Sequence, residues 1–385
     1  MTAVKVPEIS ELLLEKVVAA RVAPAAAAGY IGASRSDGAP RIGTAGTLPG
    51  GLGVESSSLF DLASVSKPVV ACTAARLAAA GLIELRQPLG SLLSAARGTA
   101  SEHISLELLL AHRAGLEAHR PYFAPVSAGQ PVCIQQVLRA AARTRRAECT
   151  GPAPEGGFAP LYSDLGYMLV GAALEAATTT PLDELVASQV SVPLGLELGS
   201  ARQLYASRPS FMRDVVPTEV TLARGGALRG VVHDDNAWAL SGHGSSGHAG
   251  LFGTVEAVLR FGAELLKVLE GQSEWLDQSA LWSLVKPRPG GTLRAGFDGK
   301  SEGASSAGSL AGPQTFGHLG FTGTSLWCDP GAGIVTVLLT NRVCPTRDNP
   351  RIRAARPLVH DALFEKAGQS QLGAGRDVLP GPPNP

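Results

Sequence analysis

The sequence contains no run approaching the 18 apolar residues of a membrane-spanning helix, and it has no excess of charge of either sign. Its 33 basic and 33 acidic residues give a formal net charge of +0, which argues against nucleic-acid or anionic-membrane partners. Cysteine is scarce, with five residues and no CxxC pair, so neither a disulfide framework nor a zinc site is indicated.

The N-terminal segment also lacks the pattern of a signal peptide, because Glu11, Glu15 and Lys16 interrupt its apolar residues. We therefore expect a cytoplasmic protein with reduced thiols. The 385 residues are 45% hydrophobic, which is enough for a large core. This length predicts either one large domain with an insertion or two domains that share a cleft.

Strand patterns lie near both ends of the chain, and helical patterns lie between them. Strands are predicted in the segments 25–34, 40–46, 315–323, 324–330 and 333–342. Helices are predicted at 8–21, 64–81, 104–111, 132–146, 164–177, 181–191, 254–270 and 350–366. We infer a sheet domain from residues 1–60 and 246–367, an inserted mainly helical domain at 61–245, and a disordered tail at 368–385. The Gly/Ser-rich segment 290–313 is expected to be a long surface loop.

The stretch LASVSKPVVA carries Ser64 and Lys67 at the start of a predicted helix, on one face and within hydrogen-bonding reach. A serine hydroxyl is a poor nucleophile unless a base removes its proton, and a lysine that is partly neutral can be that base. The helix N-terminus also leaves the Ser64 backbone N–H free to face an oxyanion. The alternative is that Ser64 is an ordinary N-cap and Lys67 an exposed residue of the first turn.

A second SxxK stretch, Ser283 to Lys286, shows how little the spacing means alone. The residues PRPGG follow Lys286 and cannot continue a helix, so Ser283 cannot begin one. After Lys67 comes Pro68, which a first helical turn tolerates, and then helix-compatible sequence. Context therefore favours the pair at Ser64.

Two further stretches carry candidate site residues. LYSDLGYMLVG places Tyr162 and Asp164 two residues apart before an apolar helix, and FGHLGFTGTSLW places His318, Gly320 and Gly323 on a predicted strand. Glycines there would let a substrate approach the backbone closely. The alternatives are a packing tyrosine, a helix-capping aspartate and glycines at a strand bend.

Together and in this order, these stretches resemble the serine β-lactamase and penicillin-binding protein superfamily, which carries an SxxK element. The branch that fits best contains the class C β-lactamases, DD-peptidases and family VIII esterases, with a Tyr-x-Asn motif in place of SDN. The resemblance runs from about residue 25 to 365. It implies an α+β, β-lactamase/transpeptidase-like fold: an antiparallel sheet flanked by N- and C-terminal helices, with an inserted helical domain.

The resemblance also implies roles for residues. Ser64 matches the acylated nucleophile, Lys67 its base, and Tyr162 the tyrosine that moves protons. His318-Leu319-Gly320 matches the KTG position, and the backbone N–H groups of Ser64 and Phe321 match the oxyanion hole. The family requires neither a metal nor another cofactor.

Two residues depart from the family pattern, and both face the expected substrate. Asp164 replaces an amide that donates to the substrate; an ionised carboxylate accepts only, and is suited to pair with Lys67. His318 replaces the lysine that helps to bind substrate carboxylates, and a neutral histidine binds anions less well. We expect Asp164, His318 and Gly320 to contact substrate.

His248 lies in HAGLFGT, next to the expected wall of the site, and is also a candidate substrate contact. His233, Asp234, Asp235 and His243 precede it and are of types that bind metals, but their spacing in a Gly/Ser-rich loop specifies no geometry. No metal site is predicted.

The expected activity is that of a serine hydrolase acting through an acyl-enzyme on Ser64. Its substrates would be small-molecule esters or amides, with weak or no β-lactamase activity. The alternatives are a DD-peptidase or D-aminopeptidase, a true β-lactamase, and a catalytically silent binding or sensor protein with this fold.

Overall fold

The computed structural model describes residues 4–32 and 38–372. Within them, seven strands form one sheet in the order β1, β3, β2, β12, β11, β10, β9, with the bounds Val4–Lys5, Arg41–Gly46, Ala25–Gly32, Ile334–Thr340, Ser325–Asp329, Phe316–Leu319 and Asp298–Gly299. The β1–β3 pair is parallel and the other pairs are antiparallel. The α+β class is confirmed, and the two ends of the chain share the sheet as predicted.

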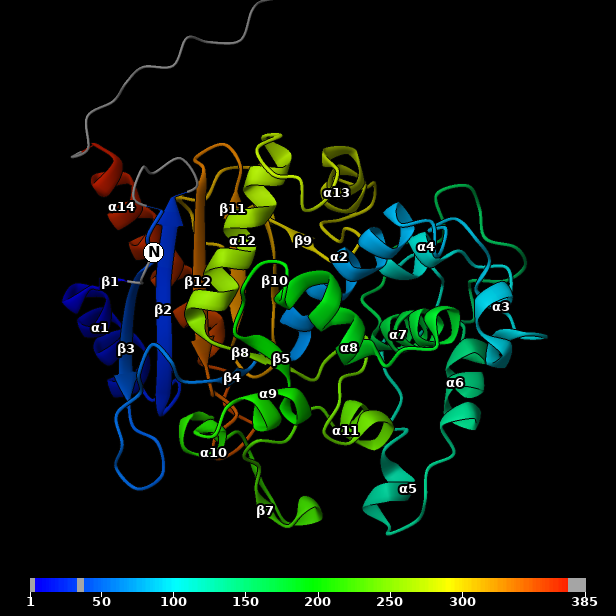
Figure 1. Ribbon diagram of the computed structural model, residues 1–385, viewed down its shortest axis with the longest axis horizontal. Helices are drawn as coiled ribbons and strands as arrows, with labels where there is room; N and C mark the ends of the chain where they lie inside the picture. Colours follow the sequence, from blue (N-terminus) through cyan, green and yellow to red (C-terminus); the bar gives the residue numbers. More distant parts are fainter. Residues whose placement is uncertain (1–3, 33–37, 373–385) are drawn as a thin grey trace, which may run out of the picture.

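Helices cover both faces of this sheet (Figure 1). Helix α12 packs on one face, and α1 and α14 pack on the other; their bounds are Val255–Leu269, Pro7–Leu13 and Ile352–Leu372. A Cβ atom on Gly262 of α12 would stand 2.6 Å from Val335 Cγ1, so glycine is needed for this close approach.

Strand β2 shows how one strand contributes to both cores. Its side chains alternate between the faces, because successive residues of a strand point to opposite sides. One core contains Ala25, Ala27 and Ile31 with α12; the other contains Ala26, Ala28 and Tyr30 with α1 and α14. This explains why β2 reads as a continuous apolar run.

The helical region lies beside the sheet (Figure 1). Its helices α2 to α8 have the bounds Ser66–Ala79, Leu89–Leu92, Leu106–Leu110, Ala124–Ser127, Ile134–Arg143, Asp164–Thr178 and Leu182–Val186. Next come α9, α10 and α11, at Ala201–Ser207, Phe211–Asp214 and Asp235–Ser241, and α13 is Gln278–Val285. A small sheet joins β4, β8 and β5, at Phe60–Asp61, Leu251–Gly253 and Leu198–Ser200; β6 and β7 pair at Val220–Thr221 and Gly226–Ala227.

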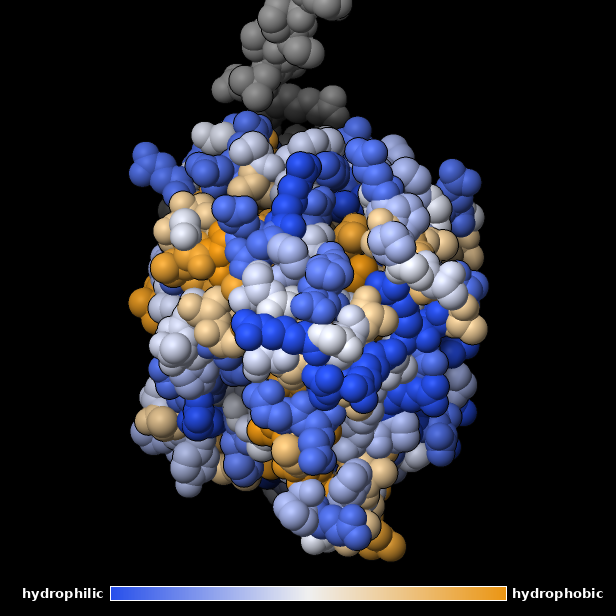
Figure 2. Space-filling model, turned by 90° about the vertical axis from the view of Figure 1, so that its right-hand side faces the viewer, coloured by the Kyte–Doolittle hydropathy of each residue, from blue (hydrophilic) through white to orange (hydrophobic). Residues whose placement is uncertain are grey.

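Figure 2 shows the end of the molecule that the helical region forms, where hydrophilic residues predominate and interrupt the apolar areas. Between residues 4 and 372, leaving out 33–37, no helix has both the length and the apolar character that crossing a membrane requires. The domain boundaries expected at residues 60 and 245 remain a prediction.

Two sequence-based expectations need correction. The segment 290–313 is a surface loop only in part: residues 302–304 and 309–310 are exposed, but the segment also contains β9, and Arg294, Ala295 and Phe297 are buried. Its few buried apolar residues are separated by glycines and serines, so they form no strand or helix pattern in the sequence. The tail expected from residue 368 is still helical there, since α14 continues to Leu372, and residues 373–385 lie outside the described residues.

His360 of α14 links the helix to the sheet. It is fully buried, and its two ring nitrogens contact Ser325 Oγ of β11 at 2.8 Å and Thr336 Oγ1 of β12 at 2.9 Å. Burial, with a smaller contribution from Arg356, lowers the pKa of His360 from 6.5 to about 3. The folded protein therefore holds this imidazole neutral, whereas the unfolded chain protonates it below about pH 6.5.

We predict that His360→Gln makes the loss of stability on acidification less steep. Between the two pKa values the unfolded wild type binds one proton more than the folded state, so stability falls as the pH drops from about 6.5 towards 3. The slope of the unfolding free energy against pH should be smaller in the variant than in the wild type by up to about 1.4 kcal/mol per pH unit. Urea unfolding at several pH values measures it. The exposed His103→Gln is the control; an unchanged slope in His360→Gln would contradict the prediction.

Candidate active site

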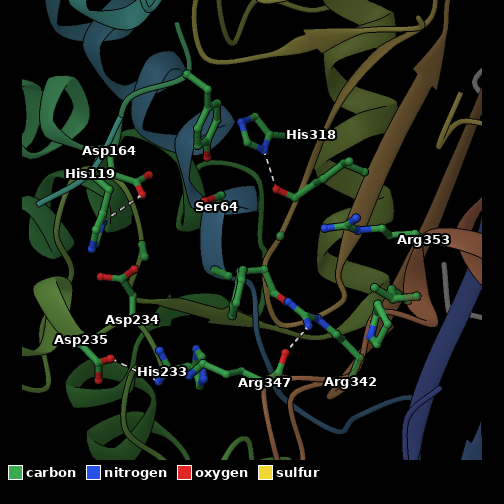
Figure 3. Close-up of a pocket in the computed structure, with 18 of the residues that line it drawn as sticks. Ser64, His119, Asp164, His233, Asp234, Asp235, His318, Arg342, Arg347 and Arg353 are labelled. Carbon is green, nitrogen blue, oxygen red and sulfur yellow. Dashed lines mark hydrogen bonds and ion pairs between the residues drawn. The ribbon is translucent and has the colours of Figure 1, made fainter. Parts of the chain in front are cut away.

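Ser64 lies in a 3-10 turn, Ala63–Val65, that leads directly into α2. Lys67 follows one turn later, and its Nζ donates to Ser64 Oγ at 2.8 Å. The lysine is fully buried, whereas Ser64 is half-buried and lines a cavity (Figure 3). The Ser283 and Lys286 pair does not begin a helix, as predicted: α13 ends at Val285, and the backbone of Lys286 is extended.

The Lys67 ammonium has three acceptors for its three N–H groups. Besides Ser64 it donates to Asp164 Oδ1 at 2.8 Å and to the His248 carbonyl at 3.1 Å. Burial alone would lower the pKa of Lys67, but the negative charge of Asp164 and the nearby Tyr162 outweigh it and raise the pKa. In turn, Lys67 overcomes the burial of Asp164 and lowers the pKa of that carboxyl. The charged pair expected from the sequence is present.

Tyr162 lies just before α7, and interactions of its hydroxyl with Lys67 and Ser64 oppose the rise in pKa that burial causes. The Lys67 Nζ is 4.8 Å from the centre of its ring. Burial raises the pKa of Tyr162, and the Asp164 charge raises it further, while Lys67 lowers it. Lys67 therefore contacts both Ser64 and Tyr162, the other two groups expected to carry the chemistry, and Lys67 and Tyr162 are both protonated at neutral pH.

His112 holds the backbone on both sides of Tyr162. Its carbonyl accepts the Leu161 N–H at 3.1 Å and its Nδ1 accepts the Ser163 N–H at 3.0 Å, so both neighbours of Tyr162 are bound to it. The two rings lie 4.7 Å apart. Burial and the Lys67 charge lower the pKa of His112 to about 3, which keeps Nδ1 available as an acceptor.

The turn after β10 carries the second expected oxyanion donor, the N–H of Phe321, which has no acceptor among the residues that the structure describes. Carbonyl contacts fix this turn: Arg356 Nη2 donates to Gly320 O at 2.6 Å, and Arg342 Nε donates to Phe321 O at 2.7 Å. A Cβ on Gly320 would stand 1.9 Å from Thr324 Oγ1 and 2.6 Å from Leu62 O. Gly320 lines the cavity, but glycine is required here to approach the nucleophile segment.

His318 occupies the position expected from the sequence, at the end of β10 and on the cavity wall (Figure 3). Its Nδ1 is 2.8 Å from the Leu319 carbonyl, a contact that requires the proton on Nδ1 and leaves Nε2 as an acceptor. Burial and the Lys67 charge lower its pKa to about 3. His318 is therefore neutral at physiological pH.

His248 does not line the cavity with its side chain, which corrects the expectation from the sequence. The side chain is 1% exposed, and its nitrogens are occupied by Asp234 Oδ1 at 2.8 Å and Ser246 Oγ at 3.1 Å. The backbone of His248 matters instead, since its carbonyl is the third acceptor of Lys67.

The cavity has a volume of about 1020 Å³, and opposite charges line two of its sides (Figure 3). His119, Asp234 and Asp235 come from the helical region, and Arg347 and Arg353 come from the C-terminal part. The Asp164 carboxylate, whose Oδ2 lies 3.9 Å from His119 Nδ1, raises the pKa of His119. Although histidines and aspartates gather here, the described part of the chain has no group of three or more side chains placed to hold a metal ion.

Sequence reasoning missed His112, His119 and the arginines of the cavity. His119 is seven residues after His112, and neither has a motif around it that predicts a contact with residues near 162. The cavity arginines lie at the end of the predicted strand 333–342, just after it and in the predicted helix 350–366, and neither pattern predicts a contact with the site. These residues reach the site through tertiary contacts between distant segments.

The mixed sheet, the helices inserted into it and the contact between Ser64, Lys67 and Tyr162 define a protein of the β-lactamase/transpeptidase-like fold. The family model described as Beta-lactamase matches residues 14–360, so the chain belongs to this family of serine hydrolases.

Both curated proteins and solved structures are similar to this chain. A protein of Salmonella agona (strain SL483), named as a D-alanyl-D-alanine carboxypeptidase, is 30% identical over 220 residues, 51% of this chain and 48% of the relative. The chain thus spans about half the length of the curated relatives it matches.

Among solved structures, the hydrolase EstCE1, described as having promiscuous acyltransferase activity, has a TM-score of 0.69 at 18% identity, covering 93% of this chain and 98% of that one. A beta-lactamase from Mycobacterium bovis has a TM-score of 0.57 at 20% identity, covering 91% and 98%. These likenesses show the fold.

We predict that Asp164→Asn moves the pH dependence of Ser64 reactivity to lower pH. The Asp164 charge raises the pKa of both Lys67 and Tyr162, so an amide leaves each group easier to deprotonate. The alkaline rise of kcat/KM for an ester should shift down by about 1 pH unit or more. The control is Asp329→Asn, which changes a buried carboxyl at the last residue of β11. A shift to higher pH, or none, would show that Asp164 does not set these pKa values.

Proposed function

We propose that this protein is a serine hydrolase that cleaves small esters or amides through an acyl-enzyme on Ser64. The observation that carries the proposal is the 2.8 Å hydrogen bond between Lys67 Nζ and Ser64 Oγ, with the Tyr162 ring centre 4.8 Å from the same Nζ. Such a group has the parts that nucleophilic catalysis needs: a hydroxyl, a path for its proton and a place for the developing oxyanion.

In the proposed reaction, Lys67 or Tyr162 first gives up its proton to solvent, and Ser64 Oγ then attacks the substrate carbonyl carbon as its own proton passes to that deprotonated group. The carbonyl oxygen gains negative charge between the N–H groups of Ser64 and Phe321. When the tetrahedral intermediate collapses, the bond to the leaving alcohol or amine breaks and that group takes the proton. Water then attacks the ester on Ser64 by the same route, which releases the acid and restores the hydroxyl.

The neutral state of His318 supports substrates without a carboxylate at that position. A β-lactam or a peptidoglycan stem carries a carboxylate, which an uncharged imidazole acceptor cannot neutralise. We therefore propose weak or no β-lactamase activity. The cytoplasmic location expected from the N-terminal residues stays a prediction.

A second candidate function, a D-alanyl-D-alanine carboxypeptidase, is favoured by Arg353. This residue lies at the start of α14, is exposed, and lines the cavity (Figure 3). Within residues 4–32 and 38–372, no side chain pairs with its guanidinium. A carboxylate at the end of a substrate would pair with this free cation. The uncharged state of His318 does not exclude such a pair.

The proposed activity predicts that Ser64→Ala abolishes labelling by a fluorophosphonate and lowers the hydrolysis of p-nitrophenyl butyrate by about 10³-fold or more, since no other hydroxyl takes its place. Intact-mass spectrometry and initial rates measure the two effects. Ser283→Ala, in the second SxxK stretch, is the matched control and should behave as the wild type. Absence of labelling in the wild type would favour a silent binding protein.

If the second candidate holds, the wild type releases D-alanine from an N-acylated D-alanyl-D-alanine peptide, and Arg353→Gln raises KM for this peptide by about 10-fold or more through the lost ion pair. The variant should hydrolyse a neutral ester normally, and the neighbouring Arg351→Gln serves as control. A wild type that leaves the peptide intact excludes this function.

A further inference from the structure

Asp61 is a buried carboxyl that the chemistry described so far does not use. It is the last residue of β4, three residues before Ser64, and it is 2% exposed. Its Oδ1 accepts the N–H of Ala63 at 2.8 Å, and its Oδ2 accepts the N–H of His233 at 2.7 Å. Each carboxylate oxygen is thus bound to the backbone of a different segment.

The first bond acts next to the nucleophile. Ala63 has a φ of +47°, in the left-handed region, where a residue with a side chain is strained. The hydrogen bond from its N–H to Asp61 holds it there. Because the peptide unit between Ala63 and Ser64 is planar, the conformation of Ala63 determines where the Ser64 N–H points.

The second bond, to His233, acts next to Phe321, whose N–H is the other expected oxyanion donor. The ring of His233 is stacked against the ring of Phe321, with centroids 5.8 Å apart and an interplanar angle of 22°. Asp61 binds the backbone N–H of His233, and Glu219 Oε2 lies 3.0 Å from His233 Nε2. Arg342 contacts the Phe321 ring as well, 4.3 Å from its centre. The position of Phe321 therefore depends on a residue that Asp61 anchors.

The backbone adds a direct link between the two segments. Thr322 Oγ1 donates to Asp61 O at 2.8 Å, and Thr324 Oγ1 donates to Leu62 O at 2.9 Å. The turn that carries Phe321 is thus bound to the two residues that precede the Ala63–Val65 turn. Asp61 contacts, directly or through one neighbour, every segment that forms the expected oxyanion hole.

We propose that Asp61 is a positioning residue that sets the geometry of the oxyanion hole: it orients the Ser64 N–H through Ala63 and the Phe321 N–H through His233. The inference rests on the proposed function, in which these two N–H groups bind the oxyanion. The contrasting possibility is that Asp61 only stabilises the fold.

The test compares Asp61→Asn with Asp329→Asn. Asp329 is equally buried and also accepts backbone N–H groups, from Gly312, Gly331 and Ala332, but it lies at the far end of β11. An amide replaces one acceptor oxygen by a donor in each case. Both variants should lose thermal stability, whereas only Asp61→Asn should lower kcat for p-nitrophenyl butyrate, by about 10–100-fold with KM changed less than about 3-fold.

Ala63→Gly separates positioning from stability. Glycine takes a φ of +47° without strain, so it needs the Asp61 bond less than alanine does. The loss of kcat caused by Asp61→Asn should therefore be at least about 5-fold smaller in the Ala63→Gly background than with Ala63. An equal loss in both backgrounds, or a folded Asp61→Asn variant with unchanged kcat, overturns the proposal.

His233→Ala keeps the proposal testable should Asp61→Asn not fold. It removes the ring stacked on Phe321 and leaves the backbone N–H that Asp61 binds, and it should lower kcat about 3-fold or more; an unchanged kcat counts against the proposal. A wild type that neither hydrolyses the ester nor reacts with a fluorophosphonate overturns the proposed function and this inference together. An active wild type with insensitive variants overturns the inference alone.

Discussion

The ion pair between Lys67 and Asp164 is the interaction on which the rest of the site depends. The ammonium is fully buried, and a buried charge without a partner costs several kcal/mol. Its acceptors come from the Ala63–Val65 turn, from the start of α7 and from the loop at His248, segments far apart in the sequence. Satisfying this one ammonium therefore requires these three segments to meet at one place.

The same pair shapes the chemistry. An amide at position 164 would leave Lys67 closer to losing its proton, whereas the carboxylate holds the ammonium charged and raises the pKa of Tyr162 as well. In the proposed mechanism, the pair thus keeps Lys67 and Tyr162 protonated until the pH rises. On the opposite side, the low pKa of His318 keeps that wall uncharged next to the reacting groups.

The sequence was sufficient for the parts of the site that are local. The spacing of Ser64 and Lys67, the helix after them and the strand that ends at Leu319 could all be predicted, since neighbours in sequence determine them. The order of the motifs was enough to indicate the fold, because the family arranges them in one way.

Residues that act across the fold could not be predicted in this way. His112 binds the backbone on both sides of Tyr162, and Asp61 reaches the N–H of His233, yet neither contact has a spacing rule. His248 was placed on the wall because its neighbours suggested it, but the structure uses its carbonyl. Gly320 was attributed to substrate access, whereas the space is filled by Leu62 and Thr324.

The central claim is that Ser64 becomes acylated. It is tested most directly by mixing the protein with p-nitrophenyl butyrate, quenching with acid within the first turnovers, and mapping the product by mass spectrometry. The account predicts a mass increase of one butyryl group on the peptide that contains Ser64 and on no other. Hydrolysis without acylation of Ser64, or a butyryl group on a different residue, would contradict it.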